Sequence, residues 1–255
     1  MGDLAYMMLM PFLFFFLFFL AYLFRKRKVE KILFAELDES EKDLEARDFF
    51  NRILKIERSA KAFYYAEVIF LIIDTLFILF GGYKTYLEEV EFIKEFPSFS
   101  ISPLSSVLIK FMAPIIMWVL VFFLIIFAMI MKKKENKRIT EMLDNLENIK
   151  HLKFAKEDFL RSDRILATGV VSMSDIKLGD RYLFSVYPAY IIPYIYIQKM
   201  EVERFYRRGG SIYYLDIILK RSFQNIKIYF AKKDVAEKVR EFILERNKDL
   251  SKREY

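Results

Sequence analysis

The chain has 255 residues, of which 55% are hydrophobic and 29% are charged, and its formal net charge is +7. Apolar and charged residues are segregated into blocks, which is typical of a membrane protein and not of a soluble domain with one core and one surface. The absence of Cys excludes disulfide frameworks, thiolate metal sites and Cys nucleophiles, and the single His excludes His-rich metal clusters. We therefore expect no cofactor and no metal ion.

Three apolar blocks predict three transmembrane helices. The first lies within residues 1–24, the second in residues 63–83 and the third in residues 107–131. Each provides about 20 residues or more, the length that crosses a hydrocarbon core. A cleaved signal peptide is the alternative for the first block, but its acidic start and the four cations at residues 25–28 favour a retained span.

Basic residues beside the spans predict their orientation. Cations that flank a span stay on the cytoplasmic side, and such clusters occur at residues 25–28 and 132–134. Three spans place both clusters in the cytoplasm when the N-terminus is outside and the C-terminus is inside. Because Phe, Ile, Lys and Tyr are abundant, as in AT-rich genomes, we expect a multi-pass protein of a bacterial plasma membrane.

Three ionisable residues interrupt the second and third blocks: Glu67, Asp74 and Lys110. Glu67 and Asp74 are seven residues apart and therefore lie on nearly one helix face. Such groups face a partner, a cavity or an interface, so they could handle ions or protons or contact another subunit. Alternatively, Asp74 is a neutral carboxyl bonded to a neighbouring helix or paired with Lys110. Two or three isolated polar groups make a poor transport pathway, which favours structural or assembly roles.

The segments that connect the spans are predicted to be mostly helical. Residues 25–62 contain no Pro or Gly and predict a cytoplasmic helix that continues into the second span. Residues 84–106 form a short external loop, and residues 132–160 form a helical connector. The connector carries an apolar stripe that we expect to pack on a neighbouring helix or domain: Ile139, Met142, Leu143, Leu146 and Ile149.

Residues 161–255 predict a separate domain with an antiparallel sheet. Extended segments rich in β-branched and aromatic residues are expected at residues 165–174, 181–187, 191–194, 199–206, 211–220 and 225–230. Turns are expected at residues 175–180 and at Gly209-Gly210. An amphipathic helix at residues 232–247 then closes the sheet with one apolar face. The predicted fold class is a membrane α-helical protein of three spans with a cytoplasmic α+β domain.

This order resembles the pleckstrin-homology-like (PH-like) fold, as found in bacterial membrane proteins that pair a few spans with one such domain. The resemblance rests on residues 178–184 leading into a strand, Ile192-Pro193-Tyr194, the glycine hairpin, and the closing segment at residues 232–239. It implies a binding or scaffold module without catalysis. A mixed α+β domain of another topology is the alternative.

Four basic residues are candidate contacts with a lipid headgroup or a partner. PH-like domains that bind phosphoinositides use cations near the first hairpin loop, where this chain offers Lys177 and Arg181, each beside an aspartate. Arg207 and Arg208 form a second cluster at the glycine hairpin. Because the closely spaced basic pattern is absent, we expect unselective attraction to an anionic inner leaflet.

Catalytic signatures are missing from the sequence, which contains no P-loop, dinucleotide fingerprint, zinc motif or nucleophile elbow. His151 is expected to be a surface residue. Asp180, Glu201 and Glu203 could serve a metal-dependent nuclease, but no lysine stands in a matching position. Aromatic and basic residues at 205–208 could bind single-stranded nucleic acid, although aromatics in strands more often pack against the sheet; we expect no nucleic-acid partner.

The expected function is a non-catalytic anchor, scaffold or assembly subunit. Its expected partners are anionic membrane lipids, other membrane or cytoplasmic proteins, and copies of itself. A small transport or channel component that uses Asp74 and Glu67 is the alternative.

Overall fold

The computed structural model describes residues 2–96, 102–207, 210–220 and 225–253. The chain divides into a helical unit, Met1–Arg25 with Ala60–Lys134, and a C-terminal unit, Lys26–Ser59 with Glu135–Tyr255. The helices are α1 (Gly2–Leu33), α2 (Glu39–Lys42), α3 (Ala46–Leu54), α4 (Ile56–Glu95), α5 (Pro103–Lys110), α6 (Met112–Asn148), α7 (Leu152–Arg161) and α8 (Lys233–Arg253). The strands are β1 (Arg164–Leu166), β2 (Ile176–Leu178), β3 (Tyr182–Val186), β4 (Ala189–Pro193), β5 (Ile197–Arg207), β6 (Gly210–Leu219) and β7 (Ile226–Phe230), and the 3-10 turn η2 (Tyr194–Tyr196) precedes β5.

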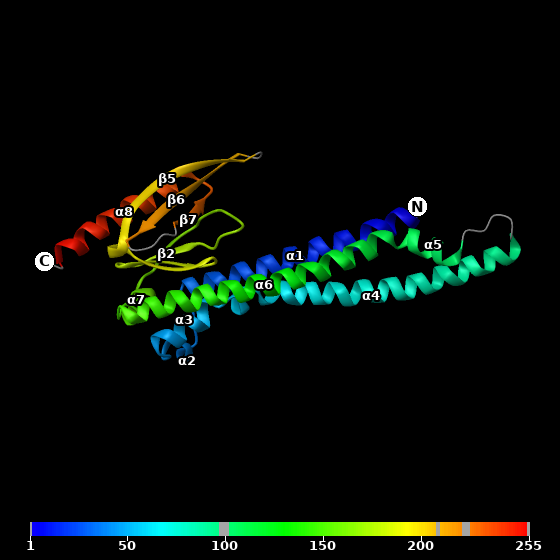
Figure 1. Ribbon diagram of the computed structural model, residues 1–255, viewed down its shortest axis with the longest axis horizontal. Coiled ribbons are helices and arrows are strands. Elements are labelled where there is room, and N and C mark those ends of the chain that lie inside the picture. The colour runs from blue at the N-terminus through cyan, green and yellow to red at the C-terminus, as the bar shows by residue number, and fades with distance from the viewer. Residues whose placement is uncertain (1, 97–101, 208–209, 221–224, 254–255) are drawn as a thin grey trace. The chain divides into compact units, whose positions relative to one another are not determined.

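Three helical segments are long and apolar enough to cross a membrane: Leu9–Leu33, Ala60–Glu95 and Met112–Asn148. In the helical unit, α1, α4 and α6 run beside one another (Figure 1) and meet at Met10, Phe70 and Val121. Most large apolar side chains point outward instead; Phe12 is 71% exposed and Phe80 is 72% exposed. A small apolar centre surrounded by outward-facing rings fits lipid and not water as the solvent. The prediction of three apolar helices of spanning length is confirmed.

Helix α4 is longer than the second apolar block. It runs through Gly81 and Gly82 to Glu95, so residues 84–95 of the predicted loop are helical. The ring of Phe111, at the break between α5 and α6, lies close to Gly81: a Cβ on Gly81 would be 2.7 Å from the ring. Gly81 therefore serves the packing of α4 against this break and does not end the helix. Residues 97–101 of the predicted loop lie outside the described residues.

The first sheet of the C-terminal unit is covered on both faces. Its order is β1-β2-β3-β4, with every pair antiparallel. Along β3, Tyr182 and Phe184 point into a cluster of helical side chains, whereas Leu183 points toward the second sheet. All five residues of β3 are buried, as expected for a strand with both faces covered. The helical side of this core comprises Val29, Ile32 and Leu33 of α1, Phe49, Phe50, Ile53 and Leu54 of α3, Ile139, Leu143 and Leu146 of α6, and Leu152, Ala155 and Phe159 of α7.

The second sheet has the order β5-β6-β7 and is also antiparallel. Helix α8 lies along it (Figure 1) and buries Ala236, Val239 and Ile243 among the apolar side chains of both sheets. The predicted sequence of antiparallel strands followed by a closing helix is therefore confirmed. Because the two sheets are separate and open, this helix covers core that the strands alone would leave in water.

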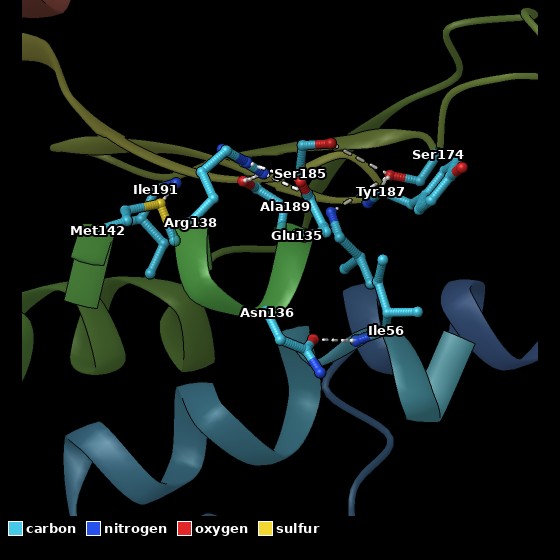
Figure 2. A network of polar contacts seen from close by, with 11 residues as sticks. Ile56, Glu135, Asn136, Arg138, Met142, Ser174, Ser185, Tyr187, Ala189 and Ile191 are labelled. Atoms are coloured by element: carbon cyan, nitrogen blue, oxygen red, sulfur yellow. Dashed lines mark hydrogen bonds and ion pairs between the residues drawn. The ribbon is translucent and has the colours of Figure 1, made fainter. Parts of the chain in front are cut away.

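Helix α6 joins the first sheet at its edge strand, β4 (Figure 2). The Arg138 guanidinium donates to the Ala189 carbonyl at 2.6 Å and lies 4.6 Å from the centre of the Tyr190 ring. The Ile191 N–H points at the Met142 sulfur at 3.4 Å. Unpaired edge groups of β4 thus find partners on α6. The predicted packing of the connector is confirmed for Ile139, Met142, Leu143 and Leu146, whereas Ile149 is exposed.

Residues 25–62 do not form the single predicted helix. Helix α1 extends to Leu33 and is followed by Ala35 at a φ of 55°, a left-handed conformation that stops a helix. Phe49 and Ile53 are buried on α3, whereas Ile56 begins α4. Helix propensity favours one continuous helix here. The apolar side chains of α3 are instead buried against α7 and β3, which requires the chain to turn after α1.

The first strands also differ from the prediction. Strand β1 covers residues 164–166 and so includes only two residues of the strand predicted at 165–174, and β2 lies inside the segment predicted as a turn, residues 175–180. The strand β2 was missed because its sequence is partly polar: Lys177 lies in its middle, where a buried strand usually carries an apolar residue.

Candidate functional site

Asp158 of α7 fixes the turn between β2 and β3. Its carboxylate accepts hydrogen bonds from the backbone N–H groups of Asp180 at 2.8 Å, Arg181 at 2.9 Å and Tyr182 at 3.0 Å. Burial raises the pKa of Asp158, and the three backbone donors oppose that rise. The arrangement attaches the turn, and with it Arg181, to helix α7.

Gly179 lets the turn approach Asp158 this closely. A Cβ at this position would lie 2.0 Å from a carboxylate oxygen of Asp158, well inside contact distance. Tyr194 supports the same turn, since its hydroxyl donates to the Gly179 carbonyl at 3.1 Å. The glycine is therefore required for contact and not for an unusual φ.

Two hollows lie on either side of Phe154, whose side chain is 46% exposed. The cleft, of about 410 Å³, is bounded by α7, the β2–β3 turn and α8, and the groove, of about 780 Å³, by the connection between α2 and α3, the start of α3 and the junction of α6 with α7. Phe154 and Glu157 line both. We call the cleft, the groove and the ring between them the Phe154 surface.

Arginines surround the cleft. Arg161, Arg181 and Arg246 come from α7, the turn and α8, and the Arg181 guanidinium lies 5.6 Å from the centre of the Phe154 ring. Four acids also line the cleft: Glu157, Asp158, Asp180 and Asp249. Asp158 accepts the backbone hydrogen bonds described above, and Asp180 pairs with Arg246 at 3.4 Å. Arg161 and Arg181 are exposed at the rim. An aromatic ring flanked by arginines is typical of the anchor residues in protein interfaces.

Lys177, predicted to be a headgroup contact, is fully buried in β2. Its ammonium donates to the Leu33 carbonyl at the end of α1, at 2.7 Å, and lies 4.4 Å from the centre of the Phe159 ring. Burial lowers the pKa of Lys177 to about 8, while the negative charges of Asp163 and Asp158 limit the fall. Lys177 therefore has no access to a lipid and links α1 to the first sheet.

The remaining basic candidates fall partly outside the described residues. Arg208 is not described, and for Arg207 only the backbone, at the end of β5, is described. The structure thus places Arg181 at the Phe154 surface and does not bring it together with Lys177.

His151 is not the plain surface residue that was predicted. It is half-buried before α7, and its Nδ1 lies 2.7 Å from the Tyr182 hydroxyl, which is also 3.2 Å from the His151 carbonyl. Burial raises the pKa of Tyr182, which keeps the phenol neutral. The pair joins the α6–α7 connection to β3, which is a structural contact.

The carboxylates of the nuclease hypothesis are not assembled. Glu203 bonds the Tyr214 hydroxyl, and Glu201 pairs with Lys199 at 2.9 Å, both on the second sheet. Asp180 belongs to the β2–β3 turn. Among the described residues, no group of three His, Asp or Glu side chains could hold a metal ion.

Known proteins offer no guide to this surface. No family model, curated protein or solved structure matches the chain. Sequence reasoning missed Phe154, Asp158, Arg161 and Arg246, although one signal was present. Leu152, Ala155 and Phe159 form the buried stripe of α7, and Phe154 is out of phase with it, which marks an exposed ring.

The carboxyls of α4 lie in the interior of the helical unit. Asp74 is fully buried and Glu67 is 5% exposed, and Phe70 lies between them on the same face. Neither oxygen of Asp74 has a hydrogen-bond partner among the described residues. The hypotheses that Asp74 pairs with Lys110 or bonds a neighbouring helix are therefore wrong for this arrangement. Lys110 ends α5 and is half-buried.

We expect Asp74→Leu to retain or raise the stability of the full chain. A buried carboxyl without a partner costs about 1–3 kcal/mol in proteins, and leucine removes that cost at similar volume. The measurement is the apparent melting temperature in detergent, with Thr75→Val as the matched variant, because Thr75 accepts a bond from Trp118 at 2.9 Å and its loss should destabilise. A clear fall for Asp74→Leu would contradict an unpartnered carboxyl.

Proposed function

We propose that this chain is a non-catalytic membrane anchor or scaffold whose C-terminal domain binds a partner protein through the Phe154 surface. The observation that carries the proposal is the exposed ring of Phe154 between two hollows, with the Arg181 guanidinium beside it. Rings and guanidinium groups of this kind provide most of the binding energy where they occur at protein interfaces.

The chemistry of the surface points to a partner segment that carries both apolar and acidic side chains. The groove is lined on its apolar side by Leu44, Ala46, Leu152 and Leu160, which can receive apolar groups. Arg161 and Arg181 present planar donors that suit carboxylates. A second copy of this chain is an alternative partner that the experiment below distinguishes.

The order of the elements supports a PH-like domain. Four antiparallel strands, three antiparallel strands and a closing helix follow one another in the chain. Domains of that kind generally act as binding or scaffold modules, which agrees with a surface that offers an exposed ring beside arginines. The abundance of Phe, Ile, Lys and Tyr favours a bacterial plasma membrane. The flanking cations favour three spans with the N-terminus outside, so the C-terminal domain would present its surface to the cytoplasm.

Transport through Asp74 and Glu67 is less well supported. The two carboxyls lie on one face of α4, but Phe70 fills the space between them and packs with Met10 and Val121. A pathway for ions needs polar groups or water along its length. Loss of ion flux in Asp74→Asn with the association of partners intact would favour transport over the scaffold.

The pair of substitutions Phe154→Ala and Arg181→Glu is expected to abolish partner association. Removing the ring and reversing the charge should cost more than about 2 kcal/mol, or more than tenfold in affinity. The Arg181 backbone bond to Asp158 is unaffected by the side chain, so the fold is retained. The measurement is quantitative identification of proteins that co-purify with the full chain in mild detergent.

The matched control is Val171→Ala, which alters an exposed apolar side chain outside the Phe154 surface. Association that survives the double substitution, or a wild-type chain that is reproducibly alone and monomeric, overturns the proposal. Co-purification of a differently tagged copy of the chain, lost in the double variant, would identify the partner as the chain itself.

A further inference from the structure

The hairpin of β5 and β6 extends past the rest of its sheet. Strand β7 pairs with β6 only from Tyr213 to Ile217, whereas β5 and β6 stay paired as far as Arg207 and Gly210. Beyond Tyr213, the end of the hairpin therefore has no neighbouring strand among the described residues. We call its described residues, 204–207 and 210–213, the hairpin tip (Figure 1).

Two large aromatic side chains of the hairpin tip are exposed. Phe205 is 52% exposed and Tyr206 is 72% exposed, and they lie on opposite faces of β5. Phe205 stands opposite Ile212 across the hairpin, so one face of the tip is apolar. Nothing in the described C-terminal unit covers these rings, which is costly in water.

The other face of the hairpin tip combines a cation with rings. The Arg204 guanidinium lies 4.3 Å from the centre of the Tyr206 ring and 5.9 Å from that of Tyr213, and its Nε donates to the Ser211 hydroxyl at 2.7 Å. In the sequence, two more cations follow Tyr206, namely Arg207 and Arg208, while the adjacent acid, Glu203, is bonded to Tyr214. The tip is therefore both aromatic and positively charged.

We propose that the hairpin tip inserts Phe205 and Tyr206 into the headgroup region of an anionic bilayer. Amphipathic rings favour that region because one end can be apolar and the other wet, and the arginines are attracted to anionic headgroups. A chain with three helices of spanning length is held at a bilayer, so the local concentration of this surface is high. A protein partner offers no such constant proximity. This contact is independent of the Phe154 surface.

The absence of Cys from the chain allows a spin label to be placed at a single site. In the experiment, Ser211→Cys carries a nitroxide beside the intact rings of the full-length protein in vesicles, and its collisions with oxygen and with a water-soluble nickel chelate report depth. Val171→Cys is the matched control, because Val171 is 72% exposed like Tyr206 but lies outside the hairpin.

In vesicles rich in phosphatidylglycerol, the label at residue 211 is expected to be severalfold more accessible to oxygen relative to nickel than the label at residue 171. Adding Phe205→Ser and Tyr206→Ser, or using phosphatidylcholine alone, should return the ratio to that of the control. A label at residue 211 that stays as nickel-accessible as the control overturns the inference. So does a protected label that ignores lipid charge, which would indicate a protein covering the tip.

Discussion

Replacing Asp158 by alanine is expected to lower the free energy of unfolding of the C-terminal unit by about 3 kcal/mol. The substitution removes one acceptor from three backbone donors, and the buried N–H of Tyr182 has no access to water. A hydrogen bond to a charged group contributes about 1.5–3 kcal/mol, and an unpaired buried donor costs a similar amount. The N–H groups of the exposed residues Asp180 and Arg181 can bind water instead, which limits the total.

Hydrogen exchange in the full chain measures this effect where it occurs. Backbone amides of β2, β3 and β4 should lose protection in Asp158→Ala, while those of α4 in the helical unit should keep theirs. The matched control is Glu157→Ala, which removes the exposed neighbouring carboxyl and should leave exchange unchanged. Unaltered protection of β3 in Asp158→Ala would show that the three bonds do not hold the turn.

Gly179→Ala tests the same contact from the other side. Its methyl group would stand 2.0 Å from a carboxylate oxygen of Asp158, so the turn must separate from α7. The same amides are then expected to lose protection, although every polar group is still present. Agreement between the two variants would attribute the effect to the contact between the turn and α7 and not to the charge of Asp158.

The pattern of apolar residues predicted the elements better than their connections. The uncharged first block was sufficient because of its length, and the stripe of Ile139, Leu143 and Leu146 was sufficient because it repeats at helical spacing. Residues 25–62 were predicted as one helix because propensity is local, whereas the turn after α1 is selected by burial of α3 against β3. The Phe154 surface could not be predicted, since the cleft forms only when α7, the turn and α8 come together.

Lys177 shows a second limit of sequence reasoning. A lysine beside an aspartate in a polar segment is usually exposed, so it was assigned to a loop and to lipid binding. The structure instead uses its length to reach the Leu33 carbonyl, one of the acceptors that a helix end leaves unpaired. A periodic pattern in the sequence cannot predict this hydrogen bond, because α1 ends 144 residues before Lys177.

The burial of Lys177 is expected to make the stability of the C-terminal unit rise with pH above 8. The pKa of Lys177 is about 8 in the folded chain against an ordinary value of 10.5, so between these values the unfolded chain binds a proton that the folded chain does not. Raising the pH therefore favours the folded state, by about 3 kcal/mol over the whole window. Below pH 8 both states are protonated and the cost of burying the charge is fully present.

Buried tyrosines set the upper limit of the pH range over which this rise in stability is expected. Burial raises the pKa of Tyr182, Tyr190 and Tyr194, so above about pH 10 the folded chain keeps protons that the unfolded chain loses, and stability falls. The difference between wild type and Lys177→Met cancels this contribution, because both chains contain the same tyrosines. That difference should shift by about 2 kcal/mol in favour of wild type between pH 7.5 and 10.

Lys232→Met is the control, since the side chain of Lys232 is exposed and its substitution should leave the wild-type pH profile unchanged. Hydrogen exchange of β2 and β3 in the full chain, repeated across the range with correction for the intrinsic rate at each pH, gives the free energies. Parallel pH profiles for wild type and Lys177→Met would contradict the prediction. They would mean that the bond to Leu33 and the other contacts of the ammonium fully offset the free energy needed to bury its charge. A stability that rises with pH only in the chain with Lys177 would show that burying this ammonium beside the end of α1 destabilises the folded state at lower pH.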